Sequence, residues 1–313
     1  SREIMSDFNA PRSTGNKRKN AGRPKSAAQK VLTANQGHKA RKRFGQNFLH
    51  DGNIINKIVR AINPKEGQNL VEIGPGMGAI TGPVLEAAGA LNVVEIDRDL
   101  IPRLRTQFFN YPNFKVYEGD ALQYDFTQLI DKEATDPAPL RIIGNLPYNI
   151  STPLIFHLLS YTEQHLVLDM HFMLQKEVVD RLAAGPGTSD YGRLGIMAQY
   201  WCRVEPLFIV GPGAFNPPPK VDSAIVRLVP HTTLPFPTKD HNVLQHVVRQ
   251  AFSMRRKTLR NTLKSMITAA DIESLDIDAG LRPERLSLEQ YVKIADFVFE
   301  NPLQADTSNS DGE

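Results

Sequence analysis

Short apolar runs alternate with segments of helical spacing along most of the chain. The runs typical of strands cover residues 69–74, 91–97, 114–121, 140–145, 165–175, 203–210 and 221–230. In the first helical segment, residues 50–62, isoleucine and valine recur at three- and four-residue intervals. This alternation predicts an α/β fold of the Rossmann type, in which helices cover both faces of a mostly parallel sheet.

The pattern changes near residue 231. Prolines and polar residues over 231–240 indicate a linker. No strand pattern returns after it, and helical spacing is present over residues 242–252, 257–267 and 288–299. We therefore predict an α/β domain over residues 38–232 and a small all-helical domain over 233–302, followed by a disordered tail over 303–313.

Charge is unevenly distributed along the sequence. Residues 1–43 contain twelve Lys and Arg and two Asp and Glu, although the net charge of the 313-residue chain is only +3. Residues 1–37 are poor in apolar side chains, so we expect a disordered basic tail when the chain is free. Basic tails bind polyanions by counterion release, which favours contact with nucleic acid over a role in solubility alone.

Composition also limits the class of protein. No apolar run approaches 18 residues and the basic start has no apolar core, so neither a membrane span nor a secretory signal is expected. The single cysteine, Cys202, excludes an internal disulfide and a multi-cysteine metal site, and its apolar surroundings predict a core position. His171 alternates within a predicted strand and is expected to pack there. We expect a cytoplasmic protein without a metal.

A glycine-rich turn follows the first predicted strand in VEIGPGMGAIT. Gly74, Gly76 and Gly78 allow the backbone to turn sharply and approach a ligand. The next two strands end in acids, Glu95 in VVEID and Asp120 in EGDA. Glu95 could accept hydrogen bonds from both hydroxyls of a ribose, and Asp120 is placed to receive an adenine amine. Because the carboxyl ends of parallel strands share one edge of a sheet, these features predict a nucleoside cofactor.

Two cofactors that contain adenosine, NAD and S-adenosylmethionine, are compatible with this edge. The dinucleotide pattern is G-x-G-x-x-G and places a pyrophosphate at a helix N-terminus. Here the spacing is G-x-G-x-G with Pro75 inside it, and the following helix offers no strongly basic side chain for a phosphate. The sequence therefore favours S-adenosylmethionine, which has no phosphate.

The fourth predicted strand ends in GNLPY. An exocyclic base amine is a weak nucleophile because its lone pair is delocalised into the ring. The side-chain oxygen of Asn145 and the carbonyl of Leu146, held open by Pro147, could accept the amine hydrogens and favour a tetrahedral nitrogen. Tyr148 offers a stacking face, which is worth roughly 1–3 kcal/mol for a base that has left its helix. The arrangement predicts catalysis that depends mainly on alignment.

Eight motifs together give the chain a resemblance to a known family. They are ARKRFGQNFLHD, VEIGPGMGAIT, VVEID, EGDA, GNLPYNIST, HFMLQKEVVDRL, GAFNPPPKVDSAIVRL and RRKTLRNTL. Over residues 37–300 the chain resembles the bacterial KsgA family of small-subunit rRNA adenine dimethyltransferases. The resemblance implies that S-adenosylmethionine donates two methyl groups to the N6 of each of two adjacent adenines near the 3′ end of 16S rRNA. It also implies action late in assembly on a small-subunit precursor, kasugamycin sensitivity when the enzyme is active, and a monomer.

The resemblance also assigns roles to individual residues. For the cofactor site it implies Gln46, Asn47, Leu49, Gly74, Gly76, Glu95, Asp120 and Asn145. For catalysis it implies Asn145, Leu146, Pro147 and Tyr148, with Phe215 of GAFNPPP near the target base. For contact with the rRNA backbone it implies Arg255, Arg256, Lys257 and Arg260. A helix over this basic stretch would place Arg256 and Arg260 on one face.

Two alternative functions remain open. The first is methylation of a large-subunit rRNA adenine, as in macrolide-resistance enzymes, although FNPPPKVDSAIVRL and RRKTLRNTL favour the small-subunit family. The second is an assembly factor whose methylation is dispensable, although the intact NLPY and cofactor motifs favour activity. The resemblance implies nothing about the role of the basic residues that precede RKRFGQNF.

Overall fold

The computed structural model describes residues 47–303. The predicted basic tail, Gln46 and all but the first residue of the predicted C-terminal tail lie outside the described residues. All of the described residues belong to one compact unit. The division into two domains near residue 232 stays a prediction.

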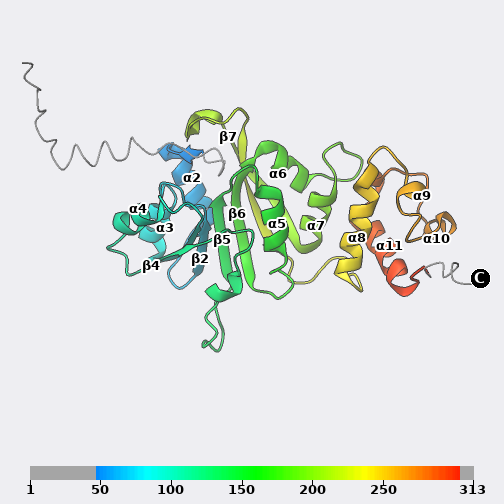
Figure 1. The fold of residues 1–313 in the computed structure, drawn as a ribbon, viewed down its shortest axis with the longest axis horizontal. Coiled ribbons are helices and arrows are strands. Elements are labelled where there is room, and N and C mark those ends of the chain that lie inside the picture. Colours follow the sequence, from blue (N-terminus) through cyan, green and yellow to red (C-terminus); the bar gives the residue numbers. More distant parts are fainter. Residues whose placement is uncertain (1–46, 304–313) are drawn as a thin grey trace, which may run out of the picture. The chain divides into compact units, whose positions relative to one another are not determined.

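A seven-stranded sheet is the centre of the described part of the chain (Figure 1). Its strands are β2 (Asn69–Ile73), β3 (Ala90–Glu95), β4 (Asn113–Glu118), β5 (Leu140–Asn145), β6 (Val167–Gln175), β7 (Cys202–Val210) and β9 (Ser223–Pro230). They lie in the order β4-β3-β2-β5-β6-β9-β7, parallel from β4 to β6, with β9 and β7 antiparallel to their neighbours. The predicted mostly parallel sheet is confirmed. The direction of strand addition reverses between β2 and β5, which is where open α/β sheets bind ligands.

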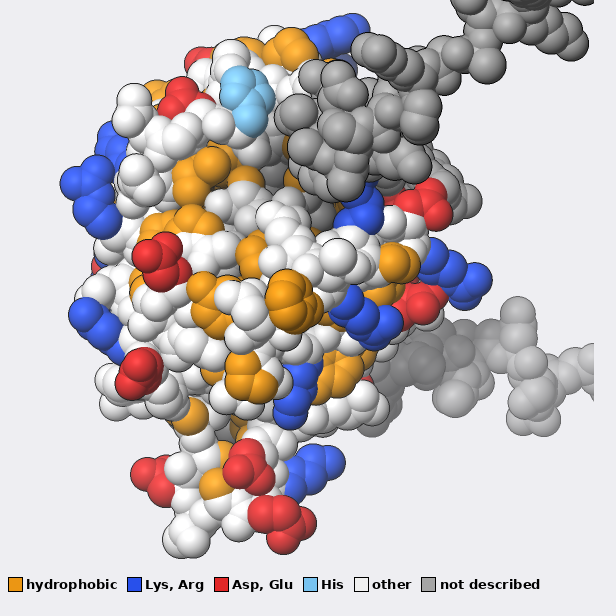
Figure 2. Space-filling model, turned by 90° about the vertical axis from the view of Figure 1, so that its left-hand side faces the viewer, with side chains coloured by type: hydrophobic (Ala, Val, Ile, Leu, Met, Phe, Trp, Pro, Cys, Tyr) orange, Lys and Arg blue, Asp and Glu red, His pale blue; other side chains and the backbone are white. Residues whose placement is uncertain are grey.

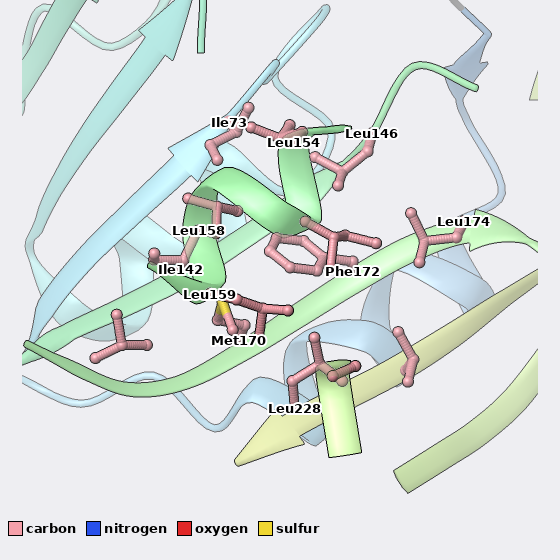
Figure 3. Close-up of a cluster of buried hydrophobic side chains, with 14 of the residues drawn as sticks. Ile73, Ile142, Leu146, Leu154, Leu158, Leu159, Met170, Phe172, Leu174 and Leu228 are labelled. Atoms are coloured by element: carbon pink, nitrogen blue, oxygen red, sulfur yellow. The ribbon is translucent and has the colours of Figure 1, made fainter. Parts of the chain in front are cut away.

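Helices cover both faces of this sheet, as predicted. They are α2 (Gly52–Ile62), α3 (Thr81–Ala88), α4 (Ile101–Gln107), α5 (Ser151–Leu159), α6 (Lys176–Ala183) and α7 (Arg193–Trp201). On one face, α5, α6 and α7 pack on the sheet, and Figure 3 shows Leu154 and Leu158 of α5 near the strands β5 and β6. On the other face, α2, α3 and α4 cover a second buried cluster. Asp51 caps α2 by accepting hydrogen bonds from the Asn53 and Ile54 amides.

A short ladder joins two distant parts of the chain. β1 (Phe48–Leu49) pairs antiparallel with β8 (Phe215–Asn216), so that Leu49 lies opposite Phe215. The His50 amide extends the pairing by donating to the Ala214 carbonyl at 2.9 Å. The ladder therefore holds the segment before α2 against the loop that precedes β9.

The C-terminal part of the described chain is helical, as predicted. It contains α8 (His241–Ala251), α9 (Leu259–Thr262), α10 (Ala269–Ser274) and α11 (Leu288–Glu300). Its buried cluster includes Ile196, Met197 and Tyr200 of α7, so this part packs directly on a helix of the α/β part. The predicted linker over 231–240 contains neither helix nor strand.

The prediction of one continuous helix over residues 257–267 is wrong. The chain forms a turn after α8, in which the Lys257 amide donates to the Met254 carbonyl, and α9 covers only four residues. The Leu259 and Arg260 amides donate to the Leu281 and Ala279 carbonyls, both at 2.9 Å. These distant carbonyls replace the partners that a continuous helix would provide, so Arg256 and Arg260 do not share one helical face.

Two predictions about buried residues are confirmed. Cys202 is buried at the start of β7, and burial raises the pKa of its thiol to about 12. His171 is buried in β6, where its Nε2 accepts a hydrogen bond from Arg227 at 2.9 Å. Burial lowers the pKa of His171 to about 4, which keeps the ring neutral as an acceptor. Over residues 47–303, no helix combines the length and the apolar character needed to cross a membrane.

Candidate active site

A cavity of about 740 Å³ opens at the carboxyl ends of β2, β3 and β5. Its lining includes every described residue that the sequence assigned to the cofactor or to catalysis, apart from Phe215. They are Asn47, Leu49, Gly74, Gly76, Glu95, Asp120, Asn145, Leu146, Pro147 and Tyr148. Residues from five separate motifs therefore meet in one concave site, which is the geometry expected when strand ends share an edge.

The glycine turn needs its glycines for two reasons. Gly74 and Gly76 have φ angles of 61° and 59°, a region that side chains with a Cβ rarely adopt. A Cβ on Gly76 would also lie 3.0 Å from the Phe48 ring, which lines the cavity. Gly78 is restricted in the same way, because a Cβ there would lie 2.9 Å from the Phe108 ring. The turn therefore brings bare backbone into the cavity.

Two buried acids line the cavity next to this turn. Glu95 is 3% exposed, and its pKa is raised to about 8 by burial and by the nearby charges of Asp97 and Glu72. Glu72 is also buried, with its pKa raised to about 7, and it accepts a hydrogen bond from the Thr81 hydroxyl. Crowded acids with raised pKa values are typical of functional sites.

Glu95 fits a ligand that brings hydroxyl donors. Its Oε1 is buried and has no hydrogen-bond partner among the described residues. A buried acceptor without a donor is costly, and a ribose hydroxyl would satisfy it. Asp120 lies on the turn after β4, where its Oδ1 accepts from the Leu122 amide at 3.0 Å, and the Gly119 amide donates to the Glu95 carbonyl. The two acids are thus held on adjoining strand ends.

The end of β5 is built tightly against β2. A Cβ on Gly144 would lie 2.7 Å from the Ile73 carbonyl oxygen, so glycine is required immediately before Asn145. The Asn145 Nδ2 donates to the Asn47 carbonyl at 3.1 Å. The Oδ1 of the Asn145 side chain remains available as an acceptor. The Leu146 amide donates to the Met173 carbonyl at 3.2 Å. Both residues are therefore fixed through their donors, and each retains an oxygen acceptor.

Tyr148 lines the same cavity and is half-buried. Its hydroxyl lies 2.6 Å from the Ser223 Oγ, and burial raises the pKa of the phenol, which keeps the ring neutral. The sequence indicated neither this serine nor Glu72. Glu72 lies inside an apolar strand, and Ser223 is 75 residues from Tyr148, so no local pattern could reveal either role.

Phe215 lies elsewhere. Its side chain is buried with Leu49 in the cluster under α2 and α3, and it does not line the cavity. Through the β1–β8 ladder it supports the segment that contributes Asn47 and Phe48 to the cavity wall. Its assignment to the target base stays a prediction.

The four basic residues of the predicted RNA contact are exposed around the turn after α8 and at α9. Arg255 also donates to the Ser189 and Tyr191 carbonyls, at 2.6 and 2.8 Å, so it holds this turn against the loop before α7. Arg260 forms a loose pair with Glu273 at 3.9 Å. Exposed cations of this kind are available to a polyanion.

Residues 37–300 match a family described as ribosomal RNA adenine dimethylase. This chain belongs to that family. It is 65% identical over 270 residues to ribosomal RNA small subunit methyltransferase A of Hahella chejuensis, a match that covers 86% of this chain and 97% of the relative. The resemblance predicted from the motifs is confirmed, and with it the enzyme class, an rRNA adenine methyltransferase.

Solved structures agree with the fold. A dimethyladenosine transferase from Plasmodium falciparum superimposes with a TM-score of 0.65 at 29% identity, over 79% of this chain and 95% of that chain. A 23S rRNA methyltransferase, ErmE, superimposes with a TM-score of 0.61 over 81% of this chain and 100% of that chain. At 23% identity, the second likeness supports the fold alone.

Proposed function

We propose that this enzyme uses S-adenosylmethionine to place two methyl groups on the N6 of each of two adjacent adenines near the 3′ end of small-subunit rRNA. The observation that carries the proposal is the single cavity shared by the glycine turn, the buried acids and the Asn145–Tyr148 turn. The name of the Hahella relative supports a small-subunit substrate over the large-subunit alternative.

The cofactor contacts follow from the acceptors in this cavity. Glu95 would bind the ribose hydroxyls through its unpartnered oxygen, and Asp120 would accept the adenine amine. The backbone of the glycine turn and Asn47 would line the rest of the cofactor. S-adenosylmethionine supplies an electrophilic methyl group on a sulfonium sulfur when it is bound.

The target amine would be held by two oxygens. For the first methyl group the Asn145 Oδ1 and the Leu146 carbonyl would each accept one amine hydrogen, which draws the nitrogen out of conjugation with the ring. The methylated nitrogen then gives up one proton to water, so one hydrogen remains to be held for the second methyl group. Positive charge develops on the nitrogen as it forms the new bond, and the same oxygens stabilise it. Tyr148 stacks on the base after it leaves its helix. No strong general base is needed in the bond-forming step, so alignment supplies most of the rate.

The proposed partner is a small-subunit precursor, bound by a monomer in the cytoplasm. The exposed cations at 255–257 and at Arg260 support contact with the rRNA backbone. Recognition of the assembled RNA would rely on shape and on unpaired bases, as folded RNA generally requires. By contrast, Figure 2 shows basic and acidic side chains of the described residues interspersed on the face at the β4 edge of the sheet.

The direct test is to map the product. Small-subunit particles that lack adenine dimethylation are incubated with the protein and labelled S-adenosylmethionine, and the label is located on the RNA. We expect label on N6 of two neighbouring adenines near the 3′ end, and none on naked large-subunit RNA. Tight particle binding without label would instead support the assembly-factor alternative.

The RNA contact has its own prediction. Arg256→Glu should weaken binding to small-subunit particles by about tenfold and reduce the salt dependence of binding, because a phosphate contact is lost. Lys132→Glu, the same charge reversal in the exposed loop after the Phe126–Leu129 turn, is the control. Affinities are measured at two salt concentrations. A fall in cofactor affinity with unchanged particle binding would contradict the assignment.

A further inference from the structure

The Tyr148 ring is anchored at its far end. Its hydroxyl and the Ser223 Oγ are 2.6 Å apart, and Ser223 is fully buried. Tyr148 lies on the turn between β5 and α5, whereas Ser223 is the first residue of β9. The hydrogen bond therefore connects the catalytic turn to a strand on the other side of β6.

Ser223 is a rigid anchor. It pairs with Gln175 of β6 on one side and with Val210 of β7 on the other. The neighbouring residue extends this pairing, because the Asp222 carbonyl accepts from the Lys176 amide at 2.9 Å. A hydroxyl held between two strands has little freedom to follow a moving ring, so the ring must conform to it.

The turn that carries Tyr148 restrains only its backbone. The Ile150 amide donates to the Pro147 carbonyl at 3.2 Å, and the Ser151 hydroxyl donates to the Tyr148 carbonyl at 3.3 Å. These bonds do not fix rotation of the half-buried ring about its side-chain torsions. Among the described residues, the Ser223 bond is the polar contact that fixes the far end of the ring.

We propose that Ser223 is a positioning residue that fixes where the Tyr148 ring lies in the cavity, and through it the position of the target adenine. The inference rests on the proposed function, in which Tyr148 stacks on that base. A stacked base takes its position from its platform, and that position decides whether the amine reaches the Asn145 and Leu146 oxygens. Small errors in such alignment reduce catalytic rates strongly.

A double-mutant cycle isolates this contact. Tyr148→Phe keeps the stacking ring and removes its hydroxyl, and Ser223→Ala removes the partner. Each single variant should lower the single-turnover rate of methyl transfer to small-subunit particles by about 3- to 10-fold, the range expected from one hydrogen bond. The double variant should be no slower than either single variant, because both lose the same bond. Ser160→Ala is the control, because it removes an exposed hydroxyl just after the C-terminal end of α5. Its single-turnover rate should stay within about twofold of the wild type.

Further measurements separate positioning from folding. Cofactor affinity of Ser223→Ala should match the wild type, since the cofactor does not depend on where the Tyr148 ring lies. The thermal midpoint should fall by no more than a few degrees, the cost of about one hydrogen bond, and by the same amount in Tyr148→Phe. Effects that multiply in the double variant, or a Ser223→Ala defect that follows a loss of stability, would overturn the proposal. Failure of the wild-type protein to methylate the particles would instead contradict the proposed function, so the two failures are distinguishable.

Discussion

Two groups of buried and partly buried charged side chains lie on or beside the same sheet and differ in how their charges are matched. At the cavity, Glu72, Glu95 and Asp97 lie close enough for their charges to interact. Glu72 is met only by a neutral hydroxyl, and one oxygen of Glu95 has no partner among the described residues. This acidic group is destabilising until a ligand supplies donors.

The second group, under α2, is matched almost completely. Arg141 binds Asp169 through Nε and Nη2, both at 2.9 Å, and its Nη2 also donates to the Ile62 carbonyl at 2.6 Å. Arg227 donates to the neutral His171, and its Nη2 reaches the Ala61 carbonyl at 2.9 Å. The two arginines thereby hold the last carbonyls of α2, the helix that follows the cavity-lining segment 47–49.

The difference separates two uses of buried charge. Paired and hydrogen-bonded charges can be kept inside a protein at little net cost, and removing one partner exposes the full desolvation penalty. Crowding of like charges raises the pKa of a buried carboxyl such as Glu95 and is typical of a place where a ligand binds. On this basis we infer that the group under α2 supports the fold, and we propose that the group at the cavity serves binding.

The largest effect on stability is expected at the matched group. Asp169→Ala leaves Arg141 buried without its carboxylate and should lower the free energy of unfolding by about 3–5 kcal/mol. Urea unfolding of the wild type and of Asp169→Ala at pH 7 measures the loss of unfolding free energy. The dependence of that free energy on urea concentration must be similar in the two proteins for the comparison to hold. A loss below about 1 kcal/mol would mean that Arg141 is satisfied by the helix carbonyls alone, and the comparison would fail.

At the cavity the expected effect depends on pH. Glu95 has a pKa of about 8 in the folded protein against an ordinary value of 4.5, so the folded state holds more protons between these values. The stability of the cofactor-free protein must therefore fall as the pH rises through this window. The Glu95→Gln side chain cannot ionise, so this variant should not show the same pH-dependent loss of unfolding free energy. Between pH 5 and pH 8 its unfolding free energy should fall by about 2 kcal/mol or more less than that of the wild type, since one pKa unit corresponds to about 1.4 kcal/mol.

Unfolding of both proteins at pH 5, 6.5 and 8, without cofactor, checks this prediction. The wild-type protein should lose stability relative to the variant as the pH rises. If the difference between the two proteins is independent of pH, the Glu95 carboxyl is not crowded as described. The same variant should also bind the cofactor more weakly, because an amide is a poorer partner for two ribose hydroxyls.

The smallest effect is expected for an exposed pair of the same chemistry. Lys176 and Asp180 are 2.9 Å apart on α6, and both side chains are 42% exposed. Asp180→Ala should change the free energy of unfolding by less than about 1 kcal/mol, because solvent screens such pairs. It serves as the matched control for Asp169→Ala. If Asp180→Ala lowers the unfolding free energy as much as Asp169→Ala does, burial is not the property that determines how much such a pair contributes to stability.

The sequence predicted which residues line the cavity better than it predicted the residues that hold them in place. Strand ends could be identified from apolar runs, and parallel strands bring their ends together, so the polar residues Glu95, Asp120 and Asn145 were expected at one edge, where they line the cavity. Glu72 was missed because an acid inside an apolar run has no periodic signal. Asn47 was assigned only through the family resemblance, and Ser223 was missed, because their contacts to Asn145 and Tyr148 join distant segments of the chain.

The failed helix over 257–267 has a similar cause. Its spacing is helical, but the Leu259 and Arg260 amides find partners in the distant segment 279–281. Arg255 then anchors the turn to the loop before α7. Tertiary hydrogen bonds overrode a local preference, and no pattern within the segment carries that information.

The central claim is that the Asn145 oxygen activates the target amine. Asn145→Ala is compared with the wild type in single-turnover methyl transfer to undimethylated small-subunit particles at saturating S-adenosylmethionine, with particle affinity measured in parallel. We expect a fall in rate of about 100-fold or more, the cost of losing one preorganised polar group, with particle binding nearly intact. Normal turnover by Asn145→Ala would contradict the proposed role of this oxygen.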